Sequence, residues 1–482
     1  MKSRIYVLHI IGMLCIAHSL TLLPPMLVSF WFHDGELEDF FITFLLLITT
    51  GYLLWFQFRH QTVELRRSDG FLVVAVFWMI LSLASALPFI IGGHLGFVDA
   101  LFEATSGFTT TGATVVLDLD KFPPSILYYR QQLQFFGGMG LVILAIAVLP
   151  MLGVGGTQLY RAETPGPMKD EKLVPRLAHA ARNLCLIYIG LTLACTIGYW
   201  LAGGNLFDAL QHAFATVSTG GFSTHDESFA YFNNPVVNFI AVVFMLLGAI
   251  NFGIHFLAIK NRHPSLYIID TETRVFLLMV SAFVVLYTLS LYYKGVYHNI
   301  FQTLDIALFE VTSVITSTGF GVTDFSVWPT FLPVMLIFIS FIGGCGGSTA
   351  GGIKVIRIVT LFKQAGQQLF LLVYPKAHRP VMIGQRVLDN NVIQAIWGFF
   401  AAYIIVFALL TLLMMMAGLD QVSAFASVAA TLNNLGPGLG EVSTTFASVS
   451  DSGKLIAVIA MLLGRLEIFP LLVILSPGFW RN

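Results

Sequence analysis

Long apolar stretches alternate with short polar stretches along most of the chain. Spanning the hydrocarbon core of a bilayer requires about 20 consecutive, mainly apolar residues. Stretches that meet this requirement are predicted at 5–31, 37–58, 71–93, 126–150, 183–203, 235–258, 274–293, 330–371 (with a break), 392–417 and 455–476. The pattern therefore predicts an all-α polytopic membrane protein.

The first apolar stretch follows Lys2 and Arg4, as in a secretory signal peptide. The apolar part of a signal peptide is about 7–15 residues long, and a small-residue cleavage site follows it. The stretch at 5–31 is longer and has no such site after it. We therefore expect it to be a retained membrane helix.

Four polar phrases, similar to one another, interrupt the apolar pattern. They read "ATSGFTTTGATV" (104–115), "AFATVSTGGFST" (213–224), "VTSVITSTGFGV" (311–322) and "VAATLNNLGPGL" (428–439). Aligned on Gly112, Gly220, Gly319 and Gly436, the phrases are 108, 99 and 117 residues apart. This period is too long for a solenoid repeat and indicates a repeated domain.

Just before the aligned glycine of each phrase lies a short, half-apolar stretch of 11–13 residues, such as "DALFEATSGFT" (99–109). At about 1.5 Å per residue, a helix of this length cannot cross a bilayer, but it can enter and turn back. Irregular backbone at membrane depth is tolerated where it is buried in protein or lines water, which four loops achieve by meeting on one axis. We expect four span–pore loop–span repeats around a central pore, plus two extra N-terminal helices. The predicted boundaries are 1–66, 67–165, 166–262, 263–378 and 379–482.

The chemistry of the phrases suits a monovalent cation. Asp99, Asp208 and Asp305 lie near the start of three of the short helices, where an N-cap oxygen and a negative charge are favoured. The partially negative C-terminal ends would then face the axis. The following Thr, Ser and Gly residues expose backbone carbonyls, and a ring of carbonyls that replaces a hydration shell is typical of potassium filters. The alternative is four ordinary outer loops, which the fourfold occurrence disfavours.

Composition and charge narrow the class further. Hydrophobic residues make up 57% of the chain, charged residues 11%, and the mean hydropathy is +0.82. Soluble domains carry about 25% charged residues. The net charge of −1 argues against nucleic acid as a partner. The cysteines form no metal-ligand spacing, and we interpret them as buried small apolar residues: Cys15, Cys185, Cys195 and Cys345.

Basic residues concentrate in alternate loops, which predicts sidedness. These residues are Arg66, Arg67, Arg161, Lys169, Lys172, Arg176, Arg182, Lys260, Arg262, Arg274, Lys354, Arg357, Lys363, Lys376, Arg379 and Arg386. The opposite loops hold only Lys121, Lys294 and Lys454. By the positive-inside rule, the basic loops and both termini are cytoplasmic, and all four polar phrases face outside.

The break in the eighth apolar stretch, "GGCGGSTAGG" at 343–352, contains six glycines in ten positions. Each glycine costs a helix about 1 kcal/mol relative to alanine, so a non-helical loop is expected. Ile353 before Lys354 excludes a Walker loop, and Thr349 occupies the place of the third glycine in a dinucleotide fingerprint. Close packing of helices through small residues remains an alternative.

Arg465 lies in the last apolar stretch, and an intramembrane arginine indicates a functional site. Glu467 is two residues away on another helix face, so it is a poor partner, and a structural contact is the alternative interpretation. Glu103 and Glu310 lie nine residues before the aligned glycine, and Gln211 takes this place in the second phrase. These side chains either face the outer vestibule or form hydrogen bonds on the helix surface.

The filter-like segments "TTTGA", "STGGFS", "TSTGFG" and "NNLGPGLG" resemble the filter loops of the Trk/Ktr/HKT superfamily of potassium transporters. Four further segments are similar to the TrkH branch of that superfamily across nearly the whole chain. They are "YYRQQLQFFGGMG" (128–140), "GVGGTQLYRAETPGP" (153–167), "FIGGCGGSTAGGIKVIRI" (341–358) and "GRLEIF" (464–469).

The resemblance implies an ion path lined by Thr110, Thr111, Gly112, Ala113, Ser218, Thr219, Gly220, Gly221, Ser317, Thr318, Gly319, Phe320, Asn434, Leu435, Gly436 and Pro437. Leu435 departs from the threonine of the other loops. In HKT relatives a serine at the first filter glycine is associated with sodium preference, so Gly112 implies potassium. The resemblance also implies a mobile intramembrane gate, with Arg465 as a barrier beside it, formed by Gly343, Gly344, Cys345, Gly346, Gly347, Ser348, Thr349, Ala350, Gly351 and Gly352.

The function implied by the resemblance is K⁺ uptake across the bacterial inner membrane, with K⁺ alone or accompanied by H⁺ or Na⁺. The chain is expected to bind no cofactor and to have no enzymatic activity, because no catalytic constellation is present. The implied partners are membrane lipid, a cytosolic nucleotide-binding ring protein (TrkA-like) and a second copy in a homodimer. The alternative is a secondary transporter of another cation or small solute, which predicts inverted repeats.

Overall fold

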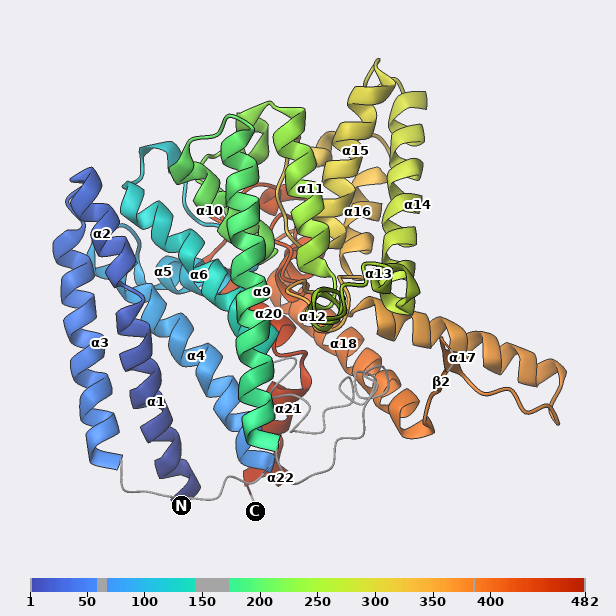
Figure 1. Ribbon diagram of the computed structural model, residues 1–482, viewed down its shortest axis with the longest axis horizontal. Helices are drawn as coiled ribbons and strands as arrows, with labels where there is room; N and C mark the ends of the chain where they lie inside the picture. The colour runs from blue at the N-terminus through green and yellow to red at the C-terminus, as the bar shows by residue number, and fades with distance from the viewer. Residues whose placement is uncertain (1, 59–66, 144–172, 385, 481–482) are drawn as a thin grey trace.

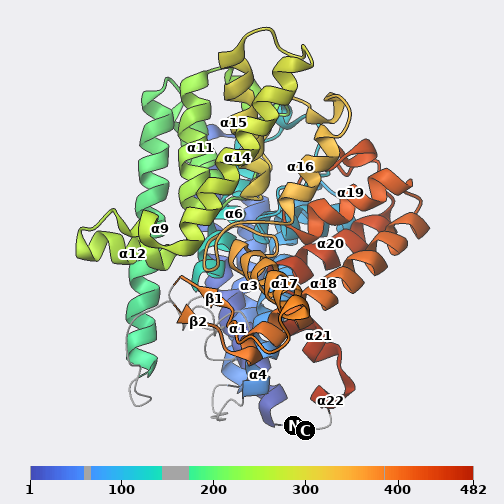
Figure 2. The same cartoon turned by 90° about the vertical axis from the view of Figure 1, so that its right-hand side faces the viewer.

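The computed structural model describes residues 2–58, 67–143, 173–384 and 386–480, and these residues are mostly helical (Figures 1 and 2). The longer helices surround a centre formed by short helices and the segments that follow them. The N-terminal helices α1 (Lys2–Leu20), α2 (Leu23–Phe32) and α3 (Leu37–Phe58) form one flank, beside α4 (Arg67–Ile91). The start of α1 and the last helix, α22 (Pro477–Trp480), lie at the same lower end of the molecule.

Six segments within the described ranges are helical, long and apolar enough to cross a membrane, and two bent helix pairs pass the same test as pairs. The six are Val7–Phe32, Leu37–Phe58, Gly70–Ile91, Ala181–Leu201, Thr271–Tyr293 and Asn390–Met416. They belong to α1–α2, α3, α4, α9 (Leu173–Leu201), α14 (Thr271–Tyr293) and α18 (Asn390–Met416).

Two further predicted spans differ from the six above, because one is only partly described and the other is divided into two helices. The span predicted at 126–150 corresponds to α6 (Pro124–Ile143), and the rest of it lies outside the described residues. The segment "GVGGTQLYRAETPGP", Arg66, Arg161, Lys169 and Lys172 also lie outside them. The break predicted in 330–371 is confirmed, because α16 (Leu332–Ser340) and α17 (Val355–Val373) are separate helices.

The predictions of continuous spans at 235–258 and 455–476 are wrong. The first is split into α11 (Pro235–Ala249) and α12 (Phe252–Asn261), which meet at 96°. The second is split into α20 (Asp451–Arg465) and α21 (Phe469–Leu475), which meet at 114°. Apolar content does not reveal these bends, because both halves of each pair are apolar.

Four short helices each follow a longer helix in sequence and precede another helix, as predicted. They are α5 (Phe97–Phe108), α10 (Leu206–Val217), α15 (Ile300–Ile315) and α19 (Gln421–Leu432). Their elements follow one order, for example α4–α5–α6 and α18–α19–α20. At 1.5 Å per residue these helices are too short to cross a bilayer.

The expected N-cap role of the aspartates is wrong. The caps are Asn205, Asn299 and Asp420, whereas α5 begins after Gly96. Asp99 and Asp208 lie in the first turn, where their charge still favours the helix N-terminus. The three aspartates bind neighbouring segments instead: Asp99 pairs with Lys454, Asp208 accepts from Thr224, and Asp305 accepts from Asn238.

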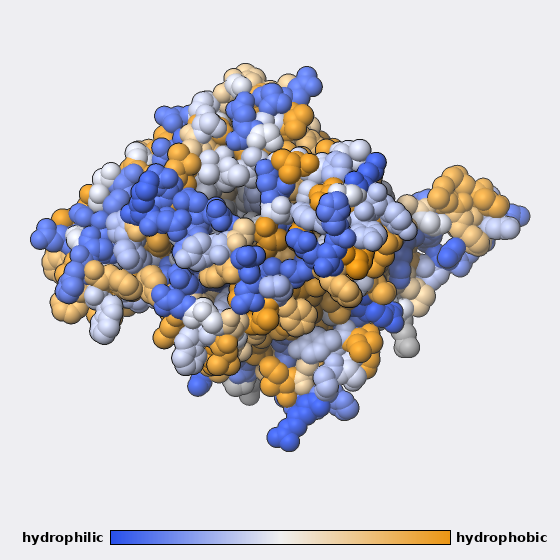
Figure 3. Space-filling model, turned by 90° about the horizontal axis from the view of Figure 1, so that it is seen from above, coloured by the Kyte–Doolittle hydropathy of each residue, from blue (hydrophilic) through white to orange (hydrophobic). Residues whose placement is uncertain are grey.

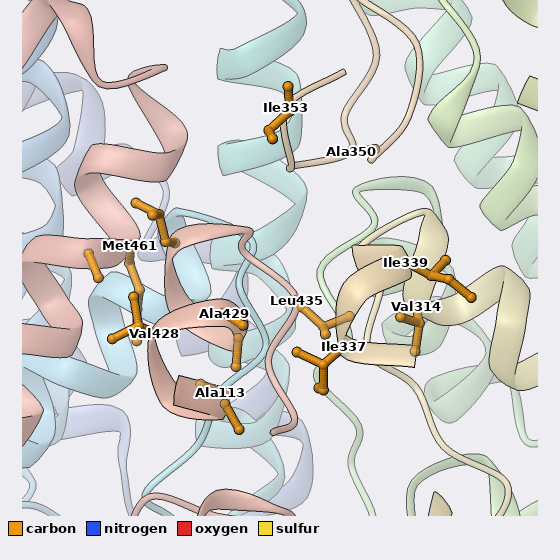
Figure 4. Packing of buried hydrophobic residues seen from close by; sticks show 14 of the residues in the cluster. Ala113, Val314, Ile337, Ile339, Ala350, Ile353, Val428, Ala429, Leu435 and Met461 are labelled. Atoms are coloured by element: carbon orange, nitrogen blue, oxygen red, sulfur yellow. The ribbon is translucent and has the colours of Figure 1, made fainter. Parts of the chain in front are cut away.

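The largest buried cluster lies at the centre of the molecule and includes residues of α4, α14, α16, α19 and α20. Figure 4 shows part of it, where Leu435 lies near Ile337 of α16. Helix α17 projects from the body, followed by a hairpin of β1 (Met382–Ile383) and β2 (Arg386–Val387), in which Met382 pairs with Val387. The upper face is rich in hydrophilic residues and is hollowed near its middle (Figure 3).

The remaining elements are short. They are α13 (Leu266–Ile269) and the 3₁₀ turns η1 (Leu119–Lys121), η4 (Ser228–Phe232), η5 (Phe325–Val327) and η6 (Gly440–Val442). The 3₁₀ turns all lie in segments that follow the polar phrases.

Candidate functional site

The four polar phrases follow the same backbone path after their short helices. Each helix is followed by a residue with φ of 50–53°, then by one residue, then by a glycine with φ of 81–98°. The residue between the two positive φ angles donates its N–H to the carbonyl five positions earlier, at 2.8 Å in every phrase. In order along the chain the triplets are Thr110–Thr111–Gly112, Thr219–Gly220–Gly221, Ser317–Thr318–Gly319 and Asn434–Leu435–Gly436. We call these four segments the filter loops 1 to 4.

The backbone corrects the sequence alignment of the second phrase by one residue. Gly221, and not Gly220, has the conformation of Gly112. Ser218 is therefore the C-cap of α10, and Phe222 corresponds to Ala113 of loop 1. The two adjacent glycines made both alignments possible, and only the φ angles distinguish them.

The filter loops meet in a closed ring. A methyl group added to Gly112 would overlap the carbonyl oxygen of Gly220 in the next loop. The same relation joins Gly221 to Thr318, Gly319 to Leu435, and Gly436 to Thr111. Glycine is required at these positions both by the positive φ and by the close approach of the neighbouring backbone. The convergence expected from the sequence is thus observed in the contacts between the loops.

Side chains stabilise the loops in different ways. In loops 1 and 3 a hydroxyl pair connects the helix end to the middle of the loop, Thr109–Thr111 and Thr316–Thr318, both at 2.7 Å. In loop 4, Asn434 Nδ2 donates to Thr111 Oγ1 at 2.9 Å and to the Met461 carbonyl at 3.1 Å. The buried side chain of Leu435 packs in the central apolar cluster instead.

Polar side chains on three short helices hold the chain just beyond the filter loops. Glu103 accepts from the Val115 N–H at 3.0 Å, and Glu310 accepts from the Val322 N–H at 2.8 Å. With the corrected alignment, the equivalent residue of the second phrase is His212 and not Gln211; its Nε2 lies 3.0 Å from Ser223 Oγ. The sequence left two roles open for Glu103 and Glu310, namely facing the outer vestibule or forming hydrogen bonds. The structure shows hydrogen bonds for both side chains.

The segments beyond the filter loops are also connected to one another. The Phe446 N–H donates to the Thr114 carbonyl at 2.8 Å, which joins the fourth phrase to the first. The Phe229 N–H donates to the Gly321 carbonyl at 3.0 Å, and this bond joins the second phrase to the third. These bonds connect the segments that follow the filter loops in sequence, and we call these segments the collar.

A cavity of about 310 Å³ opens beside loops 3 and 4. Its lining includes the loop residues Gly319, Phe320 and Pro437. It also includes three acidic residues of the collar: Asp226, Glu227 and Asp324. A negative lining raises the local concentration of cations.

His225 connects the first two phrases at the collar. Its Nδ1 lies 2.6 Å from Asp120 Oδ1, and its ring stacks on Tyr231 with a centroid distance of 3.5 Å. Burial lowers the pKa of His225, but the Asp208 and Asp120 carboxylates outweigh burial and leave the pKa above its ordinary value. His225 therefore keeps its positive charge to a higher pH than a free histidine.

The glycine-rich segment 343–352 lies against the other end of the ring. The Gly351 N–H donates to Ser317 Oγ at 2.5 Å, and Thr219 Oγ1 donates to Thr349 Oγ1 at 3.2 Å. Gly351 also lies against the Asn433 carbonyl. These contacts involve the helix-side ends of loops 2, 3 and 4, whereas the 310 Å³ cavity touches the opposite ends of loops 3 and 4.

The non-helical form of this segment is as predicted, and specific anchors hold it. Gly343, Gly347 and Gly352 have φ of 70–74°. Glu272 Oε1 accepts from the Gly346 N–H at 2.7 Å and from the Ile356 N–H at 3.2 Å. The segment therefore has a defined conformation in this structure.

Arg465 meets the glycine-rich segment directly. Its Nη1 donates to the Thr349 carbonyl at 3.0 Å, and only 3% of its surface is exposed. Within the described residues, its Nε and Nη2 have no hydrogen-bond partner. Arg465 is the last residue of α20 and lies at the bend between α20 and α21. Glu467 pairs with Arg357 and not with Arg465, as its helix face indicated.

Two buried residues of α6 contact loop 2 and had no role in the sequence interpretation. Arg130 pairs with Glu103 at 2.7 Å, donates to the Ser223 carbonyl, and lies 4.2 Å from the centre of the Phe222 ring. Gln134 bonds to the Gly220 carbonyl and to the Phe222 N–H. The signal was the polar run "YRQQLQ" within a predicted span, since intramembrane polar residues mark functional regions.

Comparisons with known proteins match the whole chain. The TrkH family model, described as "Cation transport protein", matches residues 36–480. The chain is similar to "Trk system potassium uptake protein TrkH" of Vibrio parahaemolyticus, with 48% identity over 99% of both chains. It is also similar to "Trk system potassium uptake protein TrkG" of Escherichia coli, with 41% identity over 99% of this chain and 98% of the relative.

The fold gives the same result. The crystal structure of the potassium transporter TrkH from Vibrio parahaemolyticus superposes with a TM-score of 0.92 at 45% identity and covers 100% of this chain and 99% of its own. The resemblance inferred from the filter-like segments is thereby confirmed. The chain belongs to the TrkH family of cation transport proteins.

Proposed function

We propose that this protein takes up K⁺ across the bacterial inner membrane through the ring of filter loops. The relatives described above are named potassium uptake proteins of the Trk system. In the proposed mechanism, backbone carbonyls of the loops replace the water around a K⁺ ion as it enters from the outer cavity. The membrane potential supplies about 2.3 kcal/mol per charge per 100 mV.

The observation that carries this proposal is the contact of each ring glycine with the carbonyl of the next loop. Such packing brings four equivalent backbone segments around one axis without a charged side chain at the glycine level. Neutral oxygens suit an alkali ion that must enter and leave, whereas tight divalent sites use carboxylates. The Gly220 carbonyl also accepts from Gln134, so the four loops are not electrostatically identical.

We further propose that the segment 343–352 is the gate on the inner side of the ring and that Arg465 is a barrier beside it. The segment contacts three filter loops, and Arg465 holds it at Thr349. A cation leaving the ring would meet both the loop and the unpaired part of the buried guanidinium. Opening would therefore require the segment to move away from the helix-side ends of the loops.

The partners and orientation are proposals from the family resemblance. A cytosolic nucleotide-binding ring protein would regulate opening from the side of the basic loops, and two copies of this chain would form a homodimer. Both termini would be cytoplasmic, in agreement with the common location of α1 and α22 at the end away from the collar (Figure 1). The predicted domain boundaries and the co-transport of H⁺ or Na⁺ also remain proposals.

The second candidate is a secondary transporter of another cation or small solute. The bent pairs α11–α12 and α20–α21 are broken helices of the kind that form midplane sites. That architecture uses repeats of opposite orientation. The four filter loops instead have the same backbone path and meet in one ring, which supports the filter function.

Uptake of rubidium by potassium-starved cells tests the function directly. Cells with the protein should accumulate rubidium faster than cells without it, and equal rates would contradict the proposal. The variant Gly112→Ser tests the filter, because it places a side chain next to the Gly220 carbonyl. We expect it to lose discrimination against sodium, and an unchanged K⁺-over-Na⁺ ratio would contradict the assignment of the filter.

A further inference from the structure

We propose that Gln134 of α6 is a positioning residue for selectivity, which takes the place of a threonine that loop 2 lacks. The inference rests on the proposed function of the filter loops. It concerns the middle position of each loop, occupied by Thr111, Gly220, Thr318 and Leu435.

The starting observation is a difference between loops of identical backbone path. In loops 1 and 3 the middle threonine pairs with the hydroxyl of the helix-end residue at 2.7 Å, which fixes the loop to its own helix. Loop 2 has Gly220 at this position, and a glycine has no side chain to form such a pair. Its helix-end residue, Ser218, donates instead to the Ala215 carbonyl at 3.2 Å.

Gln134 occupies the space that a threonine side chain at this position would fill. A Cβ atom added to Gly220 would lie 2.5 Å from both Cδ and Oε1 of Gln134. Gly220 does not have a positive φ, so its backbone does not exclude a side chain. What excludes it is the amide of Gln134, which is fully buried.

The same amide holds loop 2 on both sides of its ring glycine. Gln134 Nε2 donates to the Gly220 carbonyl at 2.6 Å, and Gln134 Oε1 accepts from the Phe222 N–H at 3.1 Å. A carbonyl only accepts and a backbone N–H only donates, so the orientation of the amide is determined. Gly221 lies between the two bonds and contacts the Thr318 carbonyl of loop 3.

The Gly220 carbonyl is also the atom against which Gly112 of loop 1 packs. Gln134 therefore sets the position of an oxygen that belongs to the ring, and through it the spacing between loops 1 and 2. Arg130, one turn earlier on α6, supports the same loop through the Phe222 ring and the Ser223 carbonyl. Loss of the amide would release the loop without removing any atom of the ring.

The test uses full-length protein in proteoliposomes, with K⁺ and Na⁺ fluxes measured separately. Gln134→Leu removes both hydrogen bonds to loop 2. We expect it to lower the K⁺-over-Na⁺ ratio by about fivefold or more, since about fivefold is the effect of one lost hydrogen bond. Gln131→Met is the matched control on the same helix. It should keep the ratio, because both amide atoms of buried Gln131 have no partner within the described residues.

A side-chain exchange provides a test that loss of folding cannot imitate. Gly220→Thr alone should impair flux, because the threonine overlaps Gln134. Combined with Gln134→Ala, the same threonine has room to pair with Ser218, as in loops 1 and 3. We expect the double variant to regain at least half of the wild-type ratio.

The outcomes separate this inference from the function on which it depends. If Gln134→Leu lowers total flux at an unchanged ratio, the residue is only structural and the inference is wrong. A double variant that folds but stays unselective overturns it as well. If Gly112→Ser also keeps the wild-type ratio, the filter assignment itself fails; if Gly112→Ser loses selectivity alone, only the role of Gln134 fails.

Discussion

The four filter loops share one backbone conformation, whereas the chain segments that follow them, next to the helix-side end of the ring, differ from one another. In the ring, the φ angles at equivalent positions agree within a few degrees for three loops, and the glycine of loop 4 differs only modestly. Next to the helix-side end of the ring, the helices that follow loops 2, 3 and 4 are interrupted in different ways. Chain segments meet at 96° between α11 and α12 and at 114° between α20 and α21, while α16 and α17 are separated by the glycine-rich segment.

The difference in symmetry between the ring and the segments next to it has a physical reason. A ring in which every glycine packs on the next carbonyl closes only if all four backbones have the same shape. The gate that we propose at the helix-side end of the ring requires no symmetry, since one segment and one buried arginine suffice. The segment 343–352 follows loop 3 in sequence, and Arg465 follows loop 4. The backbone repeat is therefore present in the ring, where we propose ion coordination, and absent from the region where we propose the gate.

The largest expected effect comes from breaking the ring at a single glycine. Gly319→Ala adds a methyl group that overlaps the Leu435 carbonyl, at a residue with φ of 82°. Overpacking costs about 1–3 kcal/mol, so we expect K⁺ uptake to fall by about tenfold or more. Rubidium uptake measures the effect.

The control for this substitution is Gly190→Ala in α9. Among the described residues, nothing lies within 4 Å of a Cβ added to Gly190. Uptake should remain at the wild-type level. Equal uptake by Gly319→Ala and Gly190→Ala would contradict the requirement for a closed ring.

Removal of part of the segment 345–350 tests the asymmetric region. The deletion takes away Thr349, which contacts both loop 2 and Arg465. We expect basal flux to rise in the absence of the regulatory partner, because the obstruction is shortened. Measurement in proteoliposomes with a folding check by size-exclusion chromatography distinguishes a gate from a packing element. Loss of all flux with intact folding would favour packing.

Neutralising Arg465 should have a similar but smaller effect. Arg465→Gln removes a buried positive charge next to the inner end of the ring and keeps a donor for the Thr349 carbonyl. We expect cation flux to rise by about threefold or more, because an arginine in a pore is an electrostatic barrier. The control is Arg379→Gln, which changes a charge on the outlying hairpin region. A decrease in flux with normal protein levels would contradict the barrier.

The smallest expected effect concerns the collar and its dependence on pH. The pKa of His225 is raised, so its bond to Asp120 contributes fully below the ordinary pKa of about 6.5 and is lost as pH rises through the raised value. The gain is below about 1 kcal/mol, because the Asp120 side chain is 54% exposed and water screens it. Apparent unfolding temperatures of wild type and His225→Gln should differ at pH 6 and converge at pH 9. A constant difference would contradict this assignment.

Much of the fold followed from the sequence, and the exceptions have physical causes. The short helices, the glycine-rich break and the convergence of the loops were predicted, because each departs from the apolar background. The bend after Ala249 was not, since α11 and α12 are both apolar. Asp208 was taken for a cap, although Asn205, three residues earlier, provides the cap oxygen.

The convergence of the four polar phrases was predicted, but their contacts in detail were not. Adjacent Gly220 and Gly221 allowed two alignments, and the choice required φ angles. The contact of Gln134 with loop 2 joins residues 86 positions apart, which no local pattern encodes. The meeting of Arg465 with Thr349 required the same kind of long-range information.

The most direct test of the central claim is the location of rubidium in the structure by anomalous X-ray scattering. The ring should place rubidium on the axis enclosed by Gly112, Gly221, Gly319 and Gly436, with carbonyl oxygens of all four loops around it. Rubidium bound elsewhere in the membrane region, with no density within this ring, would contradict the claim.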